Sequence, residues 1–446
     1  MKYSADEIVE VVNMFLEEDL DIRSVTLSVN TLGLVSDDPD RALTKLGSLR
    51  TTAEKFVEAV RNAEERFGVR ITTKRLAVSP VQHFLEPFPD RDYALRIAKT
   101  LDELAVNTGL DYVSGFSAYA DRGISKGART LLDSLADALN STSRLSGMVN
   151  AGSTLSGLNS DAVRAFIDSI FVMRPEASAR TAVMVNVPPD SPFVPSAHHA
   201  VGMPEAQVNV AISGPGVIES LLRRNRASSF RELYELVKRA AFKITRLGEL
   251  IGRYVAEALG VQFGSVDISV APSPKANDSV AGILEAITGA RVGSFGTLTA
   301  LAIMMDAVKK GGAMATSNVG GLSSAFIPVS EDYVMSLRAK EGSLTLKDLL
   351  YMTAVCNSGI DMVGISKAQG KTRAFAMVMD VLTLGVVLGK ITGVRAIPLD
   401  APPGATVDLG GLLGTVVVMD LAGDEAKNLF SLSGFIPSPL KRLDMG

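Results

Sequence analysis

The sequence predicts an α/β fold in which a largely parallel sheet carries helices on its outside. Apolar, strand-like segments alternate with helix-periodic segments along most of the 446 residues, and this alternation is typical of parallel sheets. No Pro/Ser-rich linker or run of charge marks a domain boundary. So many units without a break indicate one domain spanning 1–446, built as a closed barrel or as an open sheet wound on both sides.

The first elements show this pattern. Residues 4–20 are predicted as an amphipathic helix, because a capping-box spacing precedes an apolar stripe of helical period. Residues 25–29 alternate apolar and polar side chains, which indicates a strand with one wetter face. Asp38 and Pro39 are a typical helix start, so a helix is predicted over 39–66.

The later elements continue the alternation. Further strands are predicted at 71–78, 112–117, 144–149, 181–187, 207–212 and 265–270. Helices are predicted at 90–107, 126–138, 161–172, 217–226, 230–259, 277–287 and 298–307. The most apolar run, 374–389, contains Asp380 and is shorter than the roughly 20 residues that a membrane span needs. It is therefore predicted as a buried helix.

Composition and charge restrict the class of protein. Apolar residues make up 47% and charged residues 21%, which is typical of a soluble globular protein. The net charge of −4 gives no basic field for a nucleic-acid backbone, so we expect no nucleic-acid partner. The N-terminus has no apolar signal core, so no membrane partner is expected either. The single cysteine allows no intrachain disulfide, which fits a cytoplasmic protein.

The loops that follow the predicted strands are small, polar and glycine-rich. In parallel α/β folds, ligands bind outside the carboxyl ends of the strands, so these loops predict a shared site on one face. One of them, with Ser213, Gly214 and Gly216 before the helix at 217–226, has the character of an anion site at a helix N-terminus. A tight turn is the alternative for any single loop. The loops are 79–83, 150–154, 213–216 and 271–278.

A glycine-rich stretch over 311–362 is predicted to form much of one wall of this site. It contains Gly320 and Gly321, which are candidates for ligand binding. The acidic pair Glu331 and Asp332 follows, with Glu331 as a candidate catalytic carboxylate and Asp332 as a candidate ligand-binding one. The lone cysteine lies in the same stretch.

Four long motifs resemble the family called domain of unknown function 711, also called uncharacterised protein family 0210. The similarity covers nearly the whole chain. It implies a fold like that of pyruvate formate-lyase and other glycyl radical enzymes, which is a barrel of roughly ten strands with outer helices. It implies no activity, but it does suggest a small amino-acid-binding regulatory protein as a partner. The motifs lie at 21–26, 242–248, 267–274 and 321–332.

The same resemblance suggests two positions for radical chemistry. In the radical enzymes a cysteine on a central finger loop faces a glycine on a C-terminal loop. The similar positions here are Cys356, on an inward loop near 351–362, and Gly434, on a loop near 431–439. The chain departs from the radical enzymes at both places, so the resemblance implies the fold more than the reaction.

The residues themselves suggest two further kinds of chemistry. Cys356 is a candidate nucleophile if its thiol is activated, and a small buried apolar residue otherwise. His199, with Glu205 just after it, lies in a long Pro-rich loop and is a candidate general base or metal ligand. Asp278 is a candidate catalytic carboxylate, although a helix-capping role is the alternative. No spacing identifies a particular metal or cofactor.

These residues leave two classes of function open. The first is a non-radical lyase, transferase or hydrolase that acts on a small anionic metabolite inside the barrel. The second is a metabolite-binding or regulatory protein without turnover, and a glycyl-radical-type enzyme is the third alternative. A homo-oligomer, most simply a dimer, is expected from the general behaviour of proteins of this type.

Overall fold

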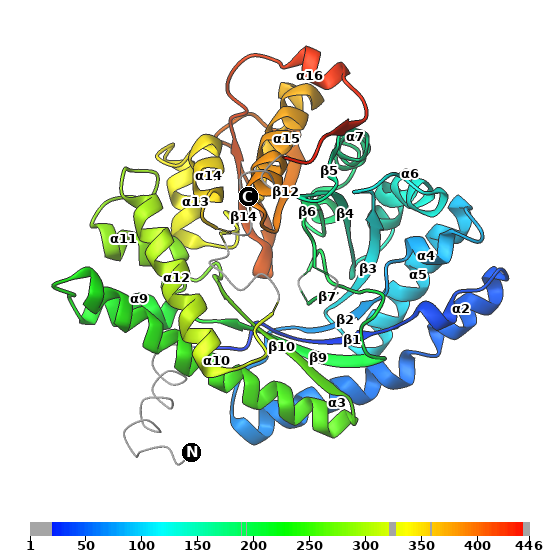
Figure 1. The fold of residues 1–446 in the computed structure, drawn as a ribbon, viewed down its shortest axis with the longest axis horizontal. Helices are drawn as coiled ribbons and strands as arrows, with labels where there is room; N and C mark the ends of the chain where they lie inside the picture. Colours follow the sequence, from blue (N-terminus) through cyan, green and yellow to red (C-terminus); the bar gives the residue numbers. More distant parts are fainter. Residues whose placement is uncertain (1–19, 189, 193, 321–326, 357–358, 440–446) are drawn as a thin grey trace, which may run out of the picture.

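A computed structural model describes residues 20–439, except 189, 193, 321–326 and 357–358 (Figure 1). The helix predicted over 4–20 lies outside this part of the chain apart from Leu20. The fold class is confirmed: the structure is α/β, with a large, mostly parallel sheet and helices on its outer side.

The first half of the chain forms five parallel strands in sequence order. Each strand pairs with the next through a parallel ladder, with register shifts in the β3–β4 and β4–β6 ladders. The strands are β1 (Ser24–Val29), β2 (Lys74–Val78), β3 (Tyr112–Tyr119), β4 (Leu145–Ser153) and β6 (Thr181–Val185). Their helices are α2 (Pro39–Gly47), α3 (Arg50–Phe67), α4 (Gln82–Leu85), α5 (Arg91–Thr108), α6 (Lys126–Asn140), α7 (Ser160–Ile170) and α8 (Pro175–Ser178), with the 3-10 turn η1 (Leu32–Leu34).

The second half runs in the opposite direction along both edges of the first. β9 is antiparallel to β1, and β12 is antiparallel to β6. The strands are β9 (Ala206–Ser213), β10 (Gln262–Ala271), β11 (Gly359–Ser366), β12 (Thr392–Leu399), β13 (Thr406–Gly410) and β14 (Gly414–Met419). The helices are α9 (Pro215–Arg224), α10 (Phe230–Leu259), α11 (Val280–Thr288), α12 (Thr297–Ala315), α13 (Tyr333–Lys340), α14 (Leu346–Thr353), α15 (Lys371–Leu388) and α16 (Lys427–Ser431), with the turns η2 (Lys367–Gln369) and η3 (Gly411–Leu413).

This reversal corrects the prediction that all strand-end loops share one face. The carboxyl ends of β1, β2, β3, β4 and β6 lie at one end of the strands. Those of β9 and β10 lie at the opposite end, because β1 and β9 are antiparallel. Loops 79–83 and 150–154 therefore lie at one end of the strands, and loops 213–216 and 271–278 lie at the opposite end. Pairing direction between distant strands is not encoded in local periodicity.

The sheet order is β10-β9-β1-β2-β3-β4-β6-β12-β11-β14-β13. Figure 1 shows these strands curving around a common centre, with the helices outside. Two isolated bridges add to this sheet: Val319 lies beside Val266 of the end strand β10, and Pro328 lies beside Asp361 of β11. Within the residues that the structure describes, no ladder joins β10 to β13, so closure of the barrel stays a prediction.

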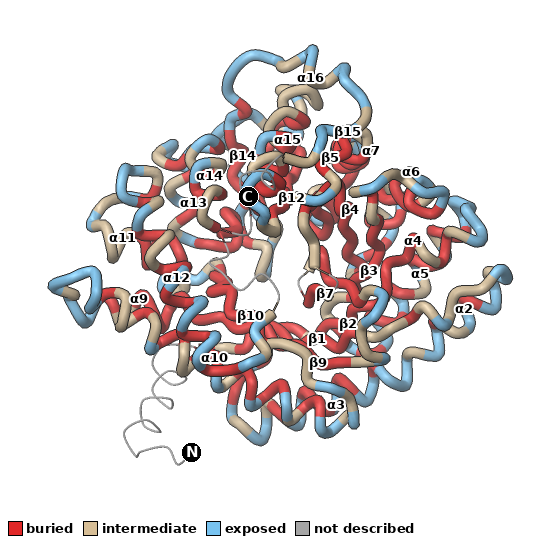
Figure 2. The backbone as a smooth tube through the Cα atoms, in the orientation of Figure 1, coloured by how far each residue is buried: buried red, intermediate tan, exposed pale blue. Residues whose placement is uncertain are grey.

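The strands bury polar side chains on the face toward this centre. The predicted wetter face of β1 is not in solvent, because Ser24, Thr26 and Ser28 are fully buried. Apolar residues of the same strand, such as Val25 and Leu27, belong to the core under the outer helices. Figure 2 shows the strands and the inner helix faces buried, while the outer helix faces are exposed.

A short inner segment lies among the strands. It contains the hairpin of β7 (Asp190–Ser191) and β8 (His198–His199), which contacts β1, β2 and β3. Thr26 of β1 donates a hydrogen bond to the Pro192 carbonyl of this segment (3.3 Å). The long loop predicted as unstructured is therefore a buried hairpin, and it is drawn near the centre of Figure 1.

The structure also differs from several predicted elements. The helix predicted over 39–66 is two helices, because the Ser48 hydroxyl donates to the Lys45 carbonyl (2.7 Å) and the helix ends there. The predicted inward loop near 351–362 contains the end of α14 and the start of β11, and the strand was not predicted. The predicted C-terminal loop contains β15 (Phe435–Ile436), which pairs with β5 (Gly157–Asn159).

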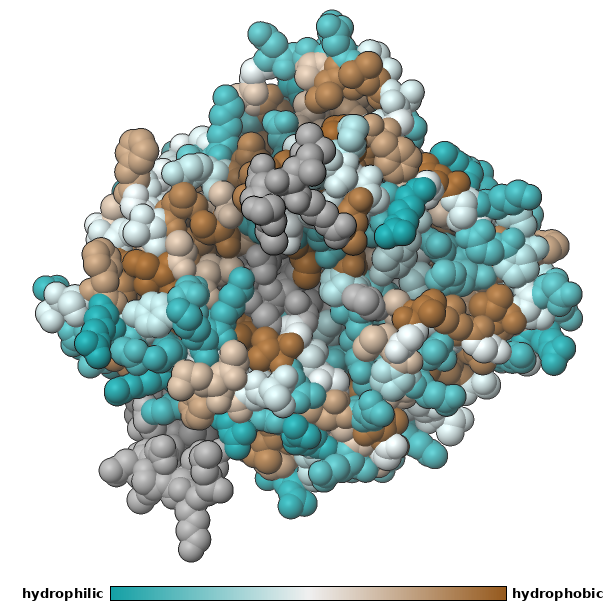
Figure 3. All heavy atoms as spheres, in the orientation of Figure 1, coloured by the Kyte–Doolittle hydropathy of each residue, from teal (hydrophilic) through white to brown (hydrophobic). Residues whose placement is uncertain are grey.

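The apolar run at 374–389 forms most of helix α15 and its C-terminal cap, and most of its apolar residues pack in the core, while Val387 and Leu388 are exposed. In the described part of the chain, no helix combines the length and the apolar character needed to span a bilayer. Hydrophilic side chains cover much of the outer surface in the view of Figure 3, with apolar residues between them.

Candidate functional site

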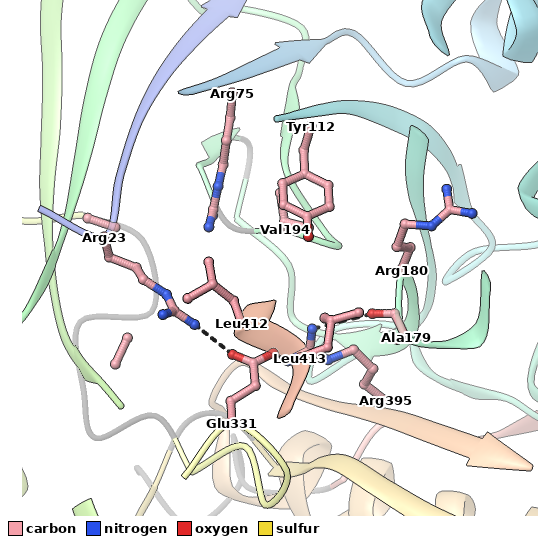
Figure 4. Close-up of a pocket in the computed structure, with 12 residues that line it drawn as sticks. Arg23, Arg75, Tyr112, Ala179, Arg180, Val194, Glu331, Arg395, Leu412 and Leu413 are labelled. Carbon is pink, nitrogen blue, oxygen red and sulfur yellow. Dashed lines mark hydrogen bonds and ion pairs between the residues drawn. The ribbon is translucent and has the colours of Figure 1, made fainter. Parts of the chain in front are cut away.

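The candidate site is a cavity of about 50 Å³ inside the sheet, which we call the arginine pocket (Figure 4). It lies at the amino ends of β2 and β3 and at the carboxyl ends of β9 and β10, so both halves of the sheet build it. The turn η3 covers one side. The lining residues are Arg23, Arg75, Tyr112, Ala179, Arg180, Val194, Ala211, Ala271, Glu331, Arg395, Leu412 and Leu413.

Glu331 links two of the arginines. Its Oε2 accepts from Arg23 Nη2 (2.8 Å), and its Oε1 accepts from Arg395 Nη2 (3.0 Å). Arg395 also donates hydrogen bonds to both carboxylate oxygens of Asp361, from Nε to Oδ1 (2.6 Å) and from Nη2 to Oδ2 (2.8 Å). Burial lowers the pKa of Arg395, but the two carboxylates outweigh burial and the net shift is upward. Arg395 therefore stays charged, and both carboxylates are committed to guanidinium groups.

Arg75 differs from Arg23 and Arg395 because it has no carboxylate partner within the part of the chain that the structure describes. Its Nε donates to Thr73 Oγ1 (2.9 Å), and its guanidinium lies 5.8 Å from the centre of the Tyr112 ring. Among the described residues its two terminal nitrogens have no hydrogen-bond partner, although the side chain is only 8% exposed. Burial, together with the nearby charge of Arg23, lowers the pKa of Arg75 to about 10. It is still charged at neutral pH.

Arg180 has a structural role. Its guanidinium donates to the backbone carbonyls of Glu176, Leu139, Thr142 and Leu145. It ties the end of α6 to the start of β4 and points away from Arg75 and Tyr112 in Figure 4. Of the four arginines that line the pocket, Arg23, Arg75 and Arg395 are therefore the ones that can face a ligand.

The charge of the pocket follows from these pairs. Arg23, Arg75 and Arg395 bring three positive charges, while Glu331 and Asp361 bring two negative ones. A buried charge without a partner costs several kcal/mol. Arginine is also the side chain best suited to hold a carboxylate or phosphate, because its planar fork can donate two parallel hydrogen bonds. The geometry therefore favours an anionic ligand beside Arg75.

Of the predicted acidic pair, only Glu331 faces the pocket. Asp332 instead caps two helices. Its oxygens accept from Met335 N at the start of α13 (2.9 Å) and from Ser279 Oγ and Val280 N at the start of α11 (2.5 and 2.7 Å). Burial raises the pKa of Asp332 to about 6. Its contacts are those of a structural cap.

The predicted anion site at a helix N-terminus already holds an anion from the chain. Gly216 N, in the first turn of α9, donates to Asp278 Oδ1 (3.1 Å). Ser213 Oγ donates to the Ala271 carbonyl (2.8 Å), and Gly214 precedes the helix. Burial raises the pKa of Asp278. These four predicted site residues thus lie together, and their contacts join α9 to the loop after β10.

His199 is fully buried in the inner hairpin, and its acidic neighbour is Asp190. Its Nδ1 lies 3.0 Å from Asp190 Oδ1, and its Nε2 lies 2.6 Å from the Pro204 carbonyl. Both neighbours are hydrogen-bond acceptors, so each ring nitrogen of His199 faces an oxygen atom. Glu205, the predicted partner, is exposed. Gln207 donates to the other Asp190 oxygen (2.7 Å), which fixes the pair in place.

Cys356 and Gly434 have contacts in different places. Cys356 is 0% exposed, belongs to the apolar core cluster and follows α14, while its carbonyl accepts from Lys390. Gly434 N donates to Asp161 Oδ2 (3.0 Å), and its carbonyl accepts from Ser160 N at the start of α7. In the described part of the chain these contacts do not join the two residues. A chemical role for either stays a prediction.

The glycine pair at 320–321 lies near β10. Gly320 N donates to the Val266 carbonyl (3.1 Å), and a side chain at position 320 would meet Ser265 at 2.5 Å. Gly320 therefore allows close approach of two backbones. Gly321 lies outside the described residues.

Sequence reasoning missed the arginines and Tyr112 that form the pocket. A signal existed: Arg75 and Arg395 are charged residues within buried strands that are largely apolar after them, and a buried charge needs a partner or a ligand. Arg75 on β2 and Arg395 on β12 reach one cavity only because of the order in which the strands of the sheet pair. Among the described residues, no group of three His, Cys, Asp or Glu side chains is placed to hold a metal ion.

Fold and cavity together define the class of this protein: a mostly parallel α/β protein with an interior site lined by arginines and by apolar side chains. The profile of the family described as Uncharacterised ACR (DUF711) matches residues 13–409. The chain is 56% identical over its full length to the UPF0210 protein of Sulfurisphaera tokodaii and 51% identical to that of Pyrobaculum islandicum, with all of each relative covered. The UPF0210 protein of Ligilactobacillus salivarius is 39% identical over 97% of this chain and 98% of its own. The chain belongs to the DUF711 family, as the resemblance predicted.

Among solved structures, the chain is similar to the anaerobic ribonucleotide reductase from Thermotoga maritima in complex with dATP and CTP. The identity is 10% and the TM-score 0.43, covering 84% of this chain and 75% of that one. At this TM-score the similarity supports no inference about chemistry.

Proposed function

We propose that this protein binds a small anionic metabolite in the arginine pocket. The observation that carries the proposal is Arg75: a buried guanidinium that faces a cavity and has no carboxylate partner among the described residues. A carboxylate or phosphate beside it would receive hydrogen bonds from the terminal nitrogens of Arg75. It would also neutralise the excess positive charge.

Glu331 and Asp361 position the other two arginines of this site. Because each carboxylate already accepts from a guanidinium, neither is free to take a proton from a ligand in this arrangement. Their role is to hold Arg23 and Arg395 against the cavity in fixed orientations. A preorganised set of donors binds an anion with little loss of side-chain entropy.

A second candidate is an enzyme, a lyase, transferase or hydrolase acting on the same anion. The observation that favours it is the Tyr112 side chain, which lines the pocket and lies against Arg75. A phenol beside a bound anion can donate a proton to it or take one from it. Radical chemistry at Cys356 and Gly434 remains the third alternative, and a metal or cofactor is not assigned.

The proposal is tested by binding with the purified full-length protein. Inorganic phosphate, sulfate, acetate and oxalate are titrated by calorimetry against the wild type, Arg75→Met and Arg129→Met. Arg129 is an exposed residue of α6, so its variant loses the same charge outside the pocket. We expect at least one anion to bind to the wild type and to Arg129→Met, and the same anion to lose at least tenfold in affinity with Arg75→Met.

Thermal unfolding separates lost binding from lost folding. Arg75→Met removes a buried charge without removing an ion pair, so its stability should equal or exceed that of the wild type. If none of the anions binds to the wild type, or if Arg75→Met binds as tightly as Arg129→Met, the arginine pocket is not an anion site.

A further inference from the structure

The arginine pocket adjoins a second, larger hollow, which we call the outer hollow. Its volume is about 390 Å³, against about 50 Å³ for the pocket. Its lining is polar and comes mostly from residues just before and at the starts of β2, β3 and β4, where the chain is close to solvent. The outer hollow is lined by Thr72, Thr73, Asp111, Tyr112, Ser143, Arg144 and Leu412.

Two residues line both spaces: Tyr112 and Leu412. Tyr112 is the first residue of β3, and Leu412 is the middle residue of η3, which comes from the opposite side of the sheet order. Both are partly exposed. An aromatic ring and an aliphatic side chain thus form the partition between the open hollow and the arginines. Figure 4 shows Leu412 beside the arginines and Tyr112 next to Arg75.

The backbone holds Leu412 at this position. Ser330 Oγ donates to the carbonyl of Leu413 (2.6 Å), and Ser330 directly precedes Glu331 of the pocket. Gly414 ends the turn with φ +66, and a Cβ there would lie 2.0 Å from the Ser330 carbonyl oxygen. Only glycine allows the turn to approach so closely. The partition is therefore fixed to the same segment that carries Glu331.

We propose that Tyr112 and Leu412 restrict the arginine pocket to small anions that reach it from the outer hollow. This inference rests on the proposed function and specifies its ligand class. One water needs roughly 10–15 Å³ of such volume, so the pocket has room for only a few water-sized groups. That suits inorganic phosphate, sulfate or a short carboxylate, and it excludes an anion with an aromatic or nucleoside substituent while the partition is in place.

The test uses two pairs of probes that share a head group but differ in size. Inorganic phosphate is compared with phenyl phosphate, and acetate with phenylacetate, by calorimetry on the full-length protein. The variants are Leu412→Ala, which shortens the partition, and the control Leu413→Ala, whose side chain lines the arginine pocket but not the outer hollow. Tyr112→Phe keeps the ring of the partition and removes its hydroxyl.

The expected result is a size preference that depends on Leu412. The wild type, Leu413→Ala and Tyr112→Phe should bind the small member of a pair at least tenfold more tightly than the phenyl member. In Leu412→Ala this ratio should fall below about threefold, mainly through tighter binding of the phenyl member. Circular dichroism and thermal unfolding of each variant establish that it is folded.

Two results would overturn the partition. One is equal binding of both members by the wild type, and the other is an unchanged ratio in a folded Leu412→Ala. In both, small anions still bind and the proposed function stands. Failure of all four probes to bind the wild type would overturn both the proposed function and the partition.

Discussion

Glu331→Gln gives the sharpest view of the electrostatics of the arginine pocket. The substitution keeps the shape of the side chain but removes its charge. Arg23 then loses the carboxylate at 2.8 Å, while Arg395 keeps Asp361 at 2.6 and 2.8 Å. The side chains of Glu331 and Arg23 are only 6% and 10% exposed. Breaking one buried pair of this kind costs about 3–5 kcal/mol of stability.

The same change should strengthen anion binding. Without Glu331 the three arginines face only one carboxylate, so the pocket gains one positive charge. At roughly 5 Å and an effective dielectric constant of about 20, one unit charge changes the energy of a bound anion by about 3 kcal/mol. We therefore expect at least a tenfold increase in phosphate affinity. Phosphate at equal concentration should then raise the unfolding temperature of Glu331→Gln by more than that of the wild type.

Glu285→Gln is the matched control. Glu285 pairs through both oxygens with Arg338, at 2.7 and 2.9 Å, and this pair does not line the arginine pocket. Thermal unfolding of both variants is followed with and without phosphate. Glu285→Gln should lose stability but gain no extra stabilisation from phosphate compared with the wild type. Equal phosphate effects in the two variants, or a Glu331→Gln protein as stable as the wild type, would refute the reasoning.

Three further predictions concern other parts of the molecule. Burial lowers the pKa of His198 below its usual 6.5, so at acidic pH the unfolded chain binds a proton that the folded chain does not. The free energy of unfolding should therefore fall as the pH drops below about 6.5. His198→Asn should weaken this pH dependence in denaturant titrations, and an unchanged pH dependence would contradict the prediction. Cys356 is fully buried, so a maleimide should label it only after denaturation, whereas rapid labelling of the native protein would support the nucleophile hypothesis. Gly414→Ala should displace η3 and reduce the size preference for anions, while Gly404→Ala, with φ +87 and nothing within 4 Å, should affect only stability; the same size preference in both would show that η3 does not hold the partition.

Much of the secondary structure was predictable because its signals are local. The helix predicted over 230–259 is α10, since Ser229 caps its first turn and Gly260 ends it in a left-handed conformation. The same holds for α5, between Asp90 and Gly109. These signals involve residues within one turn of each other, so the sequence alone contains them.

The candidate site was predictable only in part. The sequence pointed to an interior site for a small anion and to Glu331, and the structure places Glu331 at the arginine pocket. A helix-capping role was foreseen as an alternative for Asp278 but not for Asp332, which was a ligand-binding candidate and instead caps α13. His199 was predicted as a general base or metal ligand beside Glu205, and that role stays a prediction. Its acidic neighbour Asp190 was not predicted, because the contact depends on the pairing of β7 with β8.

What the amino-acid order determined by itself is the succession of strands and helices and the presence of polar side chains within apolar strands. What only the tertiary structure decided is the direction in which the two halves of the sheet pair. That pairing turns β9 against β1 and β12 against β6, and it thereby brings Arg23, Arg75 and Arg395 to one cavity. Backbone hydrogen bonds between strands are the same in kind for any sequence, so the choice between parallel and antiparallel neighbours depends on the packing of the whole chain.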